Sequence, residues 1–421
     1  MVRALLKNGS IFDGVSARLI EGRDVLVEDG KIAALISRSE RPNDLEWQID
    51  CNGLVLIPGL IDAHVHAYSS DVQVFRADQR PITLVAHHAA VRLGRMLDRG
   101  FTTVRDCGGA EHGLATALRE GLIRGPRLIY CGRMISQTGG HGDARSPDHG
   151  GAREGECWSC GCGYSGHLSV TADGVDEVRR AVRDHLRRGA GFIKFAASGG
   201  VATTASALES RQFSEGEILA IVDEVERAGT YCTAHAHPDA AIRRVIELGV
   251  HCIEHATMIS ADTAKLAADR GTCVVPTLAV GAALLDEGEA MGLPPASLAK
   301  LKTVCSQMTE GLMHMRDAGV RIGLGTDLLG ALEVHQQLEF ELRTQVFSPL
   351  EILRQATSGN ASILRCSGEI GVIAPGARAD LVALGGNPLN DIGAMKDVRF
   401  VVKDGTECWR ASGQHARSMF H

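Results

Sequence analysis

Two histidines, His64 and His66, follow an apolar run that extends from Leu54 to Ile61. The run has the composition of a buried strand, and side chains on a strand alternate between its two faces. Both imidazoles therefore point to the same face where the strand ends, and such a pair can bind one metal ion. Two buried histidines bonded to backbone carbonyls would show the same spacing, so the pair alone leaves both interpretations open.

The elements that must position this pair follow from the middle of the chain, where short apolar runs alternate with amphipathic stretches. Eight runs have strand character, at residues 54–66, 101–106, 127–132, 191–195, 230–235, 251–255, 272–276 and 321–325. Such alternation predicts an α/β fold with a parallel sheet, and eight units predict a closed (β/α)8 barrel. A doubly wound sheet is the alternative, but no Gly-x-Gly-x-x-Gly turn opens a first unit.

Both ends of the chain instead carry short strand-like runs separated by tight turns such as Asp29-Gly30. The runs near residues 379–384 and 398–405 resemble those of the first fifty residues in style. We therefore expect residues 1–57 and 360–421 to form one small β-sandwich domain. Residues 58–359 would then form the barrel.

In a barrel of this kind the catalytic groups sit at the C-terminal ends of the strands. The candidate strands carry metal-binding or proton-transferring residues at these ends, namely His64, His66, Lys194, His235, His255 and Asp327. Chance can place one or two such residues there. A full set is much harder to explain as core polar groups that have found hydrogen-bond partners.

On these residues the chain resembles the amidohydrolase superfamily. Within it, the chain is similar to the binuclear metal branch and to its prolidase-like (Xaa-Pro dipeptidase) and imidazolonepropionase-like group. The resemblance covers nearly the whole chain. Its motifs lie at residues 58–66 (PGLIDAHVH), 193–195 (IKF), 234–237 (AHAH), 253–255 (IEH), 325–327 (GTD) and 376–382 (GARADLV).

The resemblance implies two divalent metal ions per chain, with zinc as the expected metal. Lys194, carboxylated on its amine by carbon dioxide, would bridge the ions, because a carbamate is a bidentate anion whereas an ammonium cannot bind a metal. A lysine that reaches solvent from the barrel rim is the ordinary alternative. The other implied ligands are His64, His66 and Asp327 for the more buried ion, and His235 and His255 for the second.

The implied reaction is metal-assisted hydrolysis of an amide or peptide bond. Asp327 would accept the proton of the attacking water and pass it to the departing amine. The expected substrate is a small molecule, either a dipeptide or an N-acyl amino acid. The favoured substrates are Xaa-Pro dipeptides, or other dipeptides from which a small hydrophobic C-terminal residue is released. Release of a C-terminal Arg or Lys, N-acyl-amino-acid hydrolysis, cyclic amide hydrolysis and ring deamination are the alternatives. A non-catalytic barrel that serves as a binding or assembly protein is the alternative from another class, and the complete ligand set argues against it.

Four residues are candidates for substrate binding. His141, on the loop after the third strand, resembles the family histidine that contacts the scissile carbonyl, and it would be catalytic by stabilising the oxyanion. A solvated loop histidine is the alternative. The side chains of His237 and Tyr231 point to the same face of the strand as that of His235. The competing explanation for His237 is that it supports a metal ligand, and for Tyr231 that it packs in the barrel interior. Arg211 is the nearest candidate clamp for a substrate carboxylate, but an exposed arginine before a helix is ordinary.

The segment after the seventh strand, residues 277–285, is small and apolar. In similar enzymes this loop shapes the pocket for the leaving amino acid, and its lining suits proline or another compact hydrophobe. Three acidic residues follow and would instead receive an Arg or Lys side chain of the substrate. They are Asp286, Glu287 and Glu289.

A cysteine cluster lies in the long segment from Ser136 to about Ser169. Its spacing, Cys-x-x-Cys-x-Cys, can hold zinc, but no second cysteine pair lies at zinc-ribbon spacing. His149 or His167 would be the fourth ligand, and ordinary loop thiols are the competing interpretation. The cluster consists of Cys157, Cys160 and Cys162.

Charge and composition restrict the partners. The formal net charge of -7 gives no basic surface for nucleic acid. No apolar run approaches the length that spans a bilayer, and the first residues lack the features of a signal peptide. Most cysteines stand singly in apolar runs, which suits reduced thiols in a cytoplasmic protein. The resemblance implies a homo-oligomer.

Overall fold

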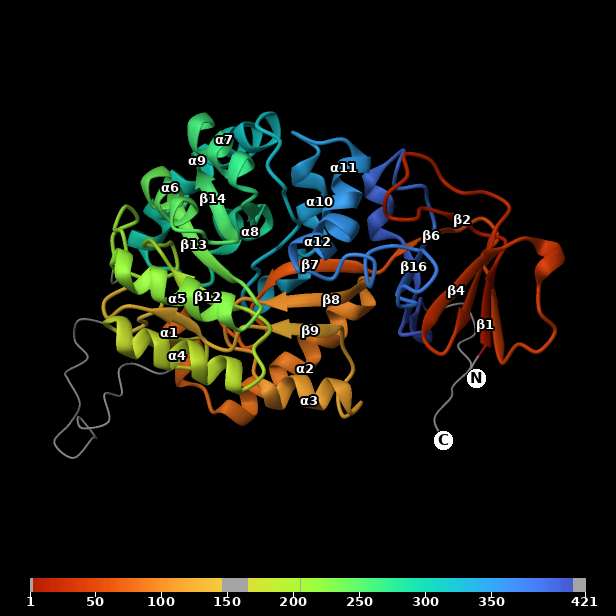
Figure 1. The fold of residues 1–421 in the computed structure, drawn as a ribbon, viewed down its shortest axis with the longest axis horizontal. Helices are drawn as coiled ribbons and strands as arrows, with labels where there is room; N and C mark the ends of the chain where they lie inside the picture. Colours follow the sequence, from red (N-terminus) through yellow and green to blue (C-terminus); the bar gives the residue numbers. More distant parts are fainter. Residues whose placement is uncertain (1–2, 146–165, 205, 412–421) are drawn as a thin grey trace.

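The computed structural model describes residues 3–145, 166–204 and 206–411, which form an α/β barrel with a β-sandwich at one side (Figure 1). The barrel strands run parallel to their neighbours in two groups, ordered β7-β8-β9 and β11-β10-β12-β13-β14-β15. Their bounds are β7 Leu60–Val65, β8 Phe101–Asp106, β9 Arg127–Tyr130, β10 Met134–Ser136, β11 Ser169–Thr171, β12 Ile193–Ala196, β13 Cys232–Pro238, β14 Cys252–Met258 and β15 Cys273–Val275.

The apolar run at residues 54–66 is two strands rather than the single strand expected. β6, Val55–Pro58, pairs antiparallel with β16, Leu381–Leu384, in the sandwich, whereas β7 pairs with β8 in the barrel. Gly59 separates them where a Cβ atom would lie 2.0 Å from Thr102 Oγ1, so a larger residue does not fit. His64 and His66 still stand where the first barrel strand ends.

Residues 321–327 close the barrel between β15 and β7. The Gly323 N–H donates to the Val274 carbonyl at 2.8 Å, and the Ala63 N–H donates to the Leu324 carbonyl at 2.9 Å. This segment forms only an isolated bridge to β15, at Ile322, and not the regular eighth strand that the sequence predicts. Its backbone is therefore free to turn sharply just before the candidate ligand Asp327.

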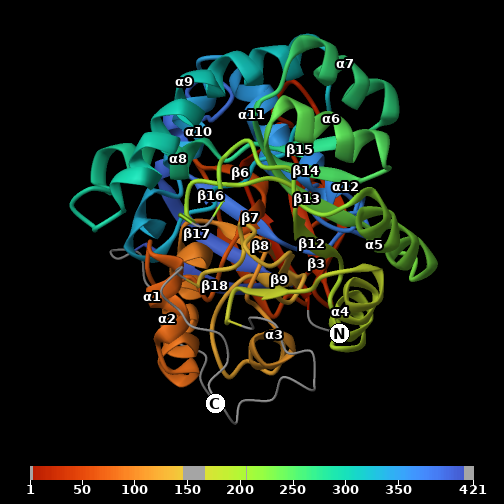
Figure 2. The same ribbon diagram turned by 90° about the vertical axis from the view of Figure 1, so that its left-hand side faces the viewer.

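Helices surround the barrel strands (Figure 2). α5 illustrates the local cause: the Ser214 hydroxyl and the Glu217 carboxylate form a capping box at its start, and its apolar side chains face the core. Residues 277–285 were expected to form a loop, but they lie largely in α8, because their apolar residues pack on α9 and the barrel. The helices are α1 Val74–Gln79, α2 Ile82–Asp98, α3 His112–Arg119, α4 Val175–Arg187, α5 Glu215–Arg227, α6 Asp239–Glu247, α7 Ala261–Arg270, α8 Leu278–Glu287, α9 Pro295–Asp317, α10 Leu338–Arg343, α11 Pro349–Arg354 and α12 Asn360–Ile363.

The two chain ends meet in the sandwich, where the red and blue ribbons of Figure 1 lie side by side. Its sheets have the orders β4-β3-β1-β5 and β18-β17-β16-β6-β2. Alternating apolar residues of both sheets fill one core between them. The proposed domain boundaries at residues 57/58 and 359/360 stay predictions. The remaining strands are β1 Arg3–Lys7, β2 Ser10–Ile11, β3 Asp24–Glu28, β4 Lys31–Ile36, β5 Trp47–Asp50, β17 Val398–Lys403 and β18 Thr406–Arg410.

Among the described residues, no helix has both the length and the apolar character needed to cross a bilayer.

Candidate active site

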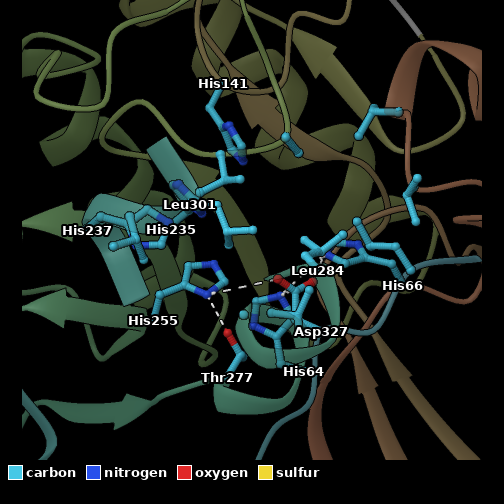
Figure 3. A pocket seen from close by; sticks show the side chains of 18 of the residues that line it. His64, His66, His141, His235, His237, His255, Thr277, Leu284, Leu301 and Asp327 are labelled. Carbon is cyan, nitrogen blue, oxygen red and sulfur yellow. Dashed lines mark hydrogen bonds and ion pairs between the residues drawn. The ribbon is translucent and has the colours of Figure 1, made fainter. Parts of the chain in front are cut away.

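Three predicted ligands converge on one point at the C-terminal end of the barrel (Figure 3). His64 Nε2 lies 3.3 Å from His66 Nε2, and Asp327 Oδ1 lies 3.4 Å from the first and 3.3 Å from the second. Ligand atoms about 2.1 Å from a tetrahedral zinc ion are about 3.4 Å apart, so this triangle fits one ion. His64 and Asp327 also form a candidate metal-binding group with His255.

Hydrogen bonds hold the rings of His66 and His255 in place. The Nε2 atom of His66 faces Asp327, whereas in His255 it is Nδ1 that lies 4.0 Å from Asp327 Oδ2. His66 Nδ1 lies 2.8 Å from the Gly108 carbonyl, which only a protonated Nδ1 can satisfy. His255 Nδ1 lies 2.8 Å from the Thr277 hydroxyl. Partners of this kind fix the ring orientation and the tautomer of metal-binding histidines.

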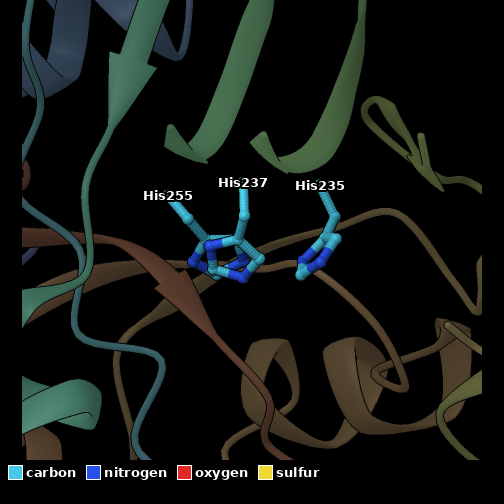
Figure 4. A group of neighbouring side chains, drawn as sticks. All are labelled: His235, His237 and His255. Carbon is cyan, nitrogen blue, oxygen red and sulfur yellow. The ribbon is translucent and has the colours of Figure 1, made fainter. Parts of the chain in front are cut away.

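A second group of histidines lies at the ends of β13 and β14 (Figure 4). The candidate ligand atoms of His235, His237 and His255 all lie within 4.8 Å of one another. His235 Nε2 lies 3.2 Å from the Gly199 carbonyl. A proton on Nε2 satisfies this contact and leaves the lone pair of Nδ1 free to bind a metal. This group can hold a second ion, and it places His237 closer to the ligands than the sequence alone suggested.

Lys194 lies on β12. Its side chain is 1% exposed and lines the same cavity as the histidines. Within the described part of the chain, no carboxylate oxygen lies within 4.0 Å of its ammonium group. A buried cation without a partner is costly, and conversion to a carbamate would remove that cost.

Burial favours the neutral imidazole, which is the form that binds metal, at His64, His141 and His237. Loss of solvation lowers the pKa of His64 to about 4 and that of His141 to about 3. It lowers the pKa of His237 to about 4 as well. Burial opposes ionisation of Asp327, but His64 and His66 outweigh it and hold the carboxyl pKa below its usual range. Burial also lowers the pKa of His66, but the Asp327 carboxylate outweighs it and raises that pKa above its usual value. The site therefore presents mostly neutral imidazoles, with His66 paired to an anion.

The backbone at two ligands adopts an unusual conformation. His255 has φ 72° and Asp327 has φ 54°, both in the left-handed region that side chains other than glycine seldom occupy. Such strain concentrates at functional sites, where the surroundings enforce it. At His255 the turn has a clear effect, because the register pairs Glu254 with His235 and would otherwise direct His255 to the opposite face.

His141 reaches the cavity as predicted. Its ring stacks on His235 with centroids 4.0 Å apart, and its buried Nδ1 has no hydrogen-bond partner. Gly200 brings the loop backbone close against both rings, since a Cβ atom there would lie 2.3 Å from His141 Cε1. An unpartnered buried nitrogen that faces a cavity is available to a ligand.

The structure does not bring Tyr231 or Arg211 to the cavity. Tyr231 lies 4% exposed beside the start of β13 and stacks on Phe192 with centroids 5.4 Å apart. Tyr231 and His235 are an even number of residues apart, so their side chains point to the same face of the strand. Four residues nevertheless separate them by about 13 Å along the strand, which places Tyr231 far below the cavity. Arg211 is exposed on the loop that follows β12.

The three acidic residues at and just beyond the end of α8 also lie outside the cavity lining. Glu287 is paired with His335 at 2.5 Å, and Asp286 and Glu289 are exposed. In the cysteine segment, Cys157, Cys160, Cys162 and His149 lie outside the described residues. His167 is described, and its Nε2 lies 2.9 Å from the Arg80 carbonyl.

About 110 Å³ of the cavity can hold the centres of water-sized molecules, and its outer wall is apolar. α8 and α9 supply part of that wall, and Figure 3 shows Leu284 and Leu301 facing the histidines. Lys194 is the only Lys or Arg side chain among its described lining residues. Apolar lining residues are Val72, Val74, Met134, Leu168, Val201, Val280, Leu284, Leu293, Leu301, Val304, Met308 and Leu329.

Sequence reasoning assigned no role to two buried carboxylates. Asp62 accepts hydrogen bonds from the Thr326 hydroxyl at 2.6 Å and from Gln336 Nε2 at 2.9 Å. Glu254 lies 2.7 Å from His64 Nδ1 and 2.6 Å from Arg105 Nη2. Burial opposes its ionisation, but Arg105 outweighs it and lowers the Glu254 pKa. The sequence did contain a signal for both residues. Each is a charged residue inside an otherwise apolar strand, and buried charged residues are rare unless they are paired.

Comparisons with known proteins identify the family of the chain. The model of the amidohydrolase family matches residues 55–408. Ochratoxinase from Aspergillus niger is 33% identical over 369 residues, which cover 85% of this chain and 74% of the relative. A prolidase solved with N-methylphosphonate-L-proline is 40% identical with a TM-score of 0.92, covering 97% of this chain and 100% of that one. An Xaa-Pro dipeptidase with methionine bound in its active site is 28% identical with a TM-score of 0.84, at 97% and 100% coverage.

The family match extends over most of the described strands and includes every residue of the two histidine groups. The resemblance to prolidase-like enzymes that the motifs indicate is confirmed, and so is the barrel with its sandwich. The chain belongs to the amidohydrolase family, whose members are hydrolases.

Proposed function

We propose that this protein uses two divalent metal ions, with zinc as the first candidate, to hydrolyse a peptide or amide bond and release an apolar amino acid. Xaa-Pro dipeptides are the first candidate substrates. The observation that carries the proposal is the Nε2–Nε2–Oδ1 triangle of His64, His66 and Asp327. The second histidine group lines the same cavity, and its His255 ring centroid lies 5.0 Å from that of His64. The prolidase and dipeptidase relatives support the choice of substrate.

The bound ions would polarise the substrate carbonyl and lower the pKa of a water molecule to about 7. Asp327 is ionised and lines the cavity, so its carboxylate can take a proton from that water and deliver it to the departing amine. His141 carries an unpartnered nitrogen toward the same space and can donate a hydrogen bond to the carbonyl oxygen as charge develops there. The apolar wall excludes other water.

Lys194 is proposed to be carboxylated and to bridge the two groups. Its burial beside neutral imidazoles and without a carboxylate partner supports this assignment. We also infer a homo-oligomer, by analogy with similar enzymes, and a cytoplasmic location, because the cysteines stand singly in apolar strands. Light scattering and cell fractionation test these two inferences.

A second candidate substrate is an amide that carries a bulky apolar group and no free carboxylate. Two observations favour it: the long apolar wall, and the lack of any arginine among the described lining residues to clamp a carboxylate.

A substrate panel separates the two candidates. Zinc-loaded protein is assayed on Xaa-Pro, Xaa-Phe and Xaa-Arg dipeptides, on their C-terminal amides, and on N-acyl-phenylalanines, with metal content measured in parallel. About two ions per chain with preference for free Xaa-Pro supports the first candidate. Equal cleavage of amidated and aromatic substrates supports the second. One ion per chain, or activity only in ring deamination, contradicts both.

A further inference from the structure

A buried charged network lies beneath the first ligand group. Glu254 and Arg105 are both 0% exposed, and their carboxylate and guanidinium groups pair at 2.6 Å. Arg105 Nε also donates to the Ala63 carbonyl at 2.6 Å, directly before His64. The network thus joins β8 and β14 to the end of β7, inside the barrel and below the cavity.

The two oxygens of Glu254 have separate partners. Oε1 accepts hydrogen bonds from Arg105 and from the Thr233 hydroxyl. Oε2 lies 2.7 Å from His64 Nδ1. Because a carboxylate held by an arginine accepts hydrogen bonds and does not donate them, the proton of this contact belongs to His64 Nδ1.

The other candidate histidine ligands have neutral partners behind them. His66 is held by the Gly108 carbonyl, His235 by the Gly199 carbonyl and His255 by the Thr277 hydroxyl. Among the described ligand histidines, His64 alone has a carboxylate within hydrogen-bond distance of its Nδ1, and the nearest carboxylate oxygen to His255 Nδ1 is 4.0 Å away. An imidazole that donates to a carboxylate is a stronger donor at its other nitrogen.

We propose that Glu254 is the positioning residue of the first metal: it fixes His64 in the tautomer whose bare Nε2 faces His66 and Asp327, and so makes this ion the more tightly held of the two. Arg105 holds Glu254 in place and keeps its charge balanced. The inference rests on the proposed binding of two ions. It adds a difference in affinity between the two ions: a chelator should remove the ion at His64 last.

Glu254→Gln tests the proposal with little change in shape. If the side-chain oxygen of the introduced glutamine accepts from Arg105, its NH2 group faces His64 Nδ1 and favours the wrong tautomer, with the proton on Nε2. We expect one ion to bind 10- to 100-fold more weakly. After dialysis against a weak chelator, content should fall from about two ions per chain to about one or fewer, measured by elemental analysis.

Thr233→Val is the matched control. It removes a hydrogen bond to the same carboxylate but leaves the contact with His64, so its metal content should stay near that of the wild type. If Glu254→Gln does not fold by circular dichroism, Glu254→Asp replaces it. The shorter side chain keeps the charge near Arg105 but cannot reach His64, so the same selective loss of one ion is expected.

The outcomes are distinguishable from failure of the proposed function. A wild-type protein that binds no metal contradicts the proposed function itself. A wild type with two ions, together with a folded Glu254 variant that holds both with unchanged affinity, overturns only the role of Glu254. Equal weakening in the Thr233→Val protein also overturns it, because it points to a general loss of packing.

Discussion

The carboxylate of Asp62 binds Thr326 twice, through its hydroxyl group at 2.6 Å and its backbone N–H at 3.1 Å, across 264 positions of the chain. The same carboxylate accepts the His64 N–H at 3.1 Å. Asp62 therefore ties the end of β7 to the turn that carries Asp327. The spacing of the first ligand triangle depends on this connection.

Asp62→Asn should loosen the triangle. An amide cannot accept all of these bonds, because its NH2 group would face the Thr326 or Gln336 donors and leave them unpaired. We expect a loss of roughly 1–3 kcal/mol in the free energy of unfolding, measured by urea denaturation, and weaker metal binding. Unchanged stability together with unchanged metal content would show that the connection is not needed.

Asp327→Asn should separate metal binding from proton transfer. The amide oxygen can still act as a ligand, but the side chain cannot carry a proton from water to amine. We expect kcat to fall by roughly 100-fold or more, with metal retained by elemental analysis. Asp286→Asn, an exposed carboxylate beyond the cavity, is the control and should keep its rate. Near-normal turnover by Asp327→Asn would exclude the proton-transfer role.

The carbamate on Lys194 can be detected directly. Protein equilibrated with ¹³C-bicarbonate should show a carbamate carbon signal by NMR, and Lys194→Ala should lose both this signal and bound metal. Lys265→Ala is the control, because that lysine is exposed on α7 and paired with Asp269 at 3.0 Å. A signal that persists in Lys194→Ala would place the carbamate elsewhere.

Two adjacent leucines of α8 test the apolar wall. Leu284 is 5% exposed and lines the cavity, whereas Leu285 is 46% exposed. Leu284→Trp should fill the space for the apolar part of the substrate and lower kcat/KM for bulky substrates about tenfold, which corresponds to about 1.4 kcal/mol. Leu285→Trp should change it less than about twofold. Equal effects of the two changes would show that the wall does not contact the substrate.

His185 on α4 should make the fold sensitive to acid. Burial, followed by the charge of Arg133, lowers its pKa from 6.5 to about 4. A lowered histidine pKa means that the folded state favours the neutral ring, so its contribution is complete above pH 6.5 and is lost as pH falls toward 4. The loss is roughly 3 kcal/mol at most.

Unfolding by urea at about pH 7 and about pH 5, with metal chelated, measures this effect. His185→Gln should show a smaller decrease in stability between the two pH values than the wild type. His87→Gln, which changes an exposed histidine on α2, should match the wild type. Identical acid sensitivity of all three proteins would contradict the assignment to His185.

The sequence by itself predicted the barrel and the sandwich made from both ends, and it named a candidate ligand set. These follow from local patterns: alternation of apolar runs and helices, and polar residues at strand ends, where a closed barrel must gather them. The parity of β13 correctly placed His235 and His237 on one face, because side-chain alternation within a strand is a local property.

Only the tertiary structure decided what supports the ligands and what surrounds the substrate. Strand parity would have turned His255 outward, and a left-handed φ of 72° brings it in. Tyr231 points to the same face as His235 but lies too far along the strand to reach the cavity. Glu254 is a partner of His64 only because the barrel brings β14 and the end of β7 together. Such contacts join residues far apart in sequence, so their distances depend on packing and on register, which no local pattern encodes.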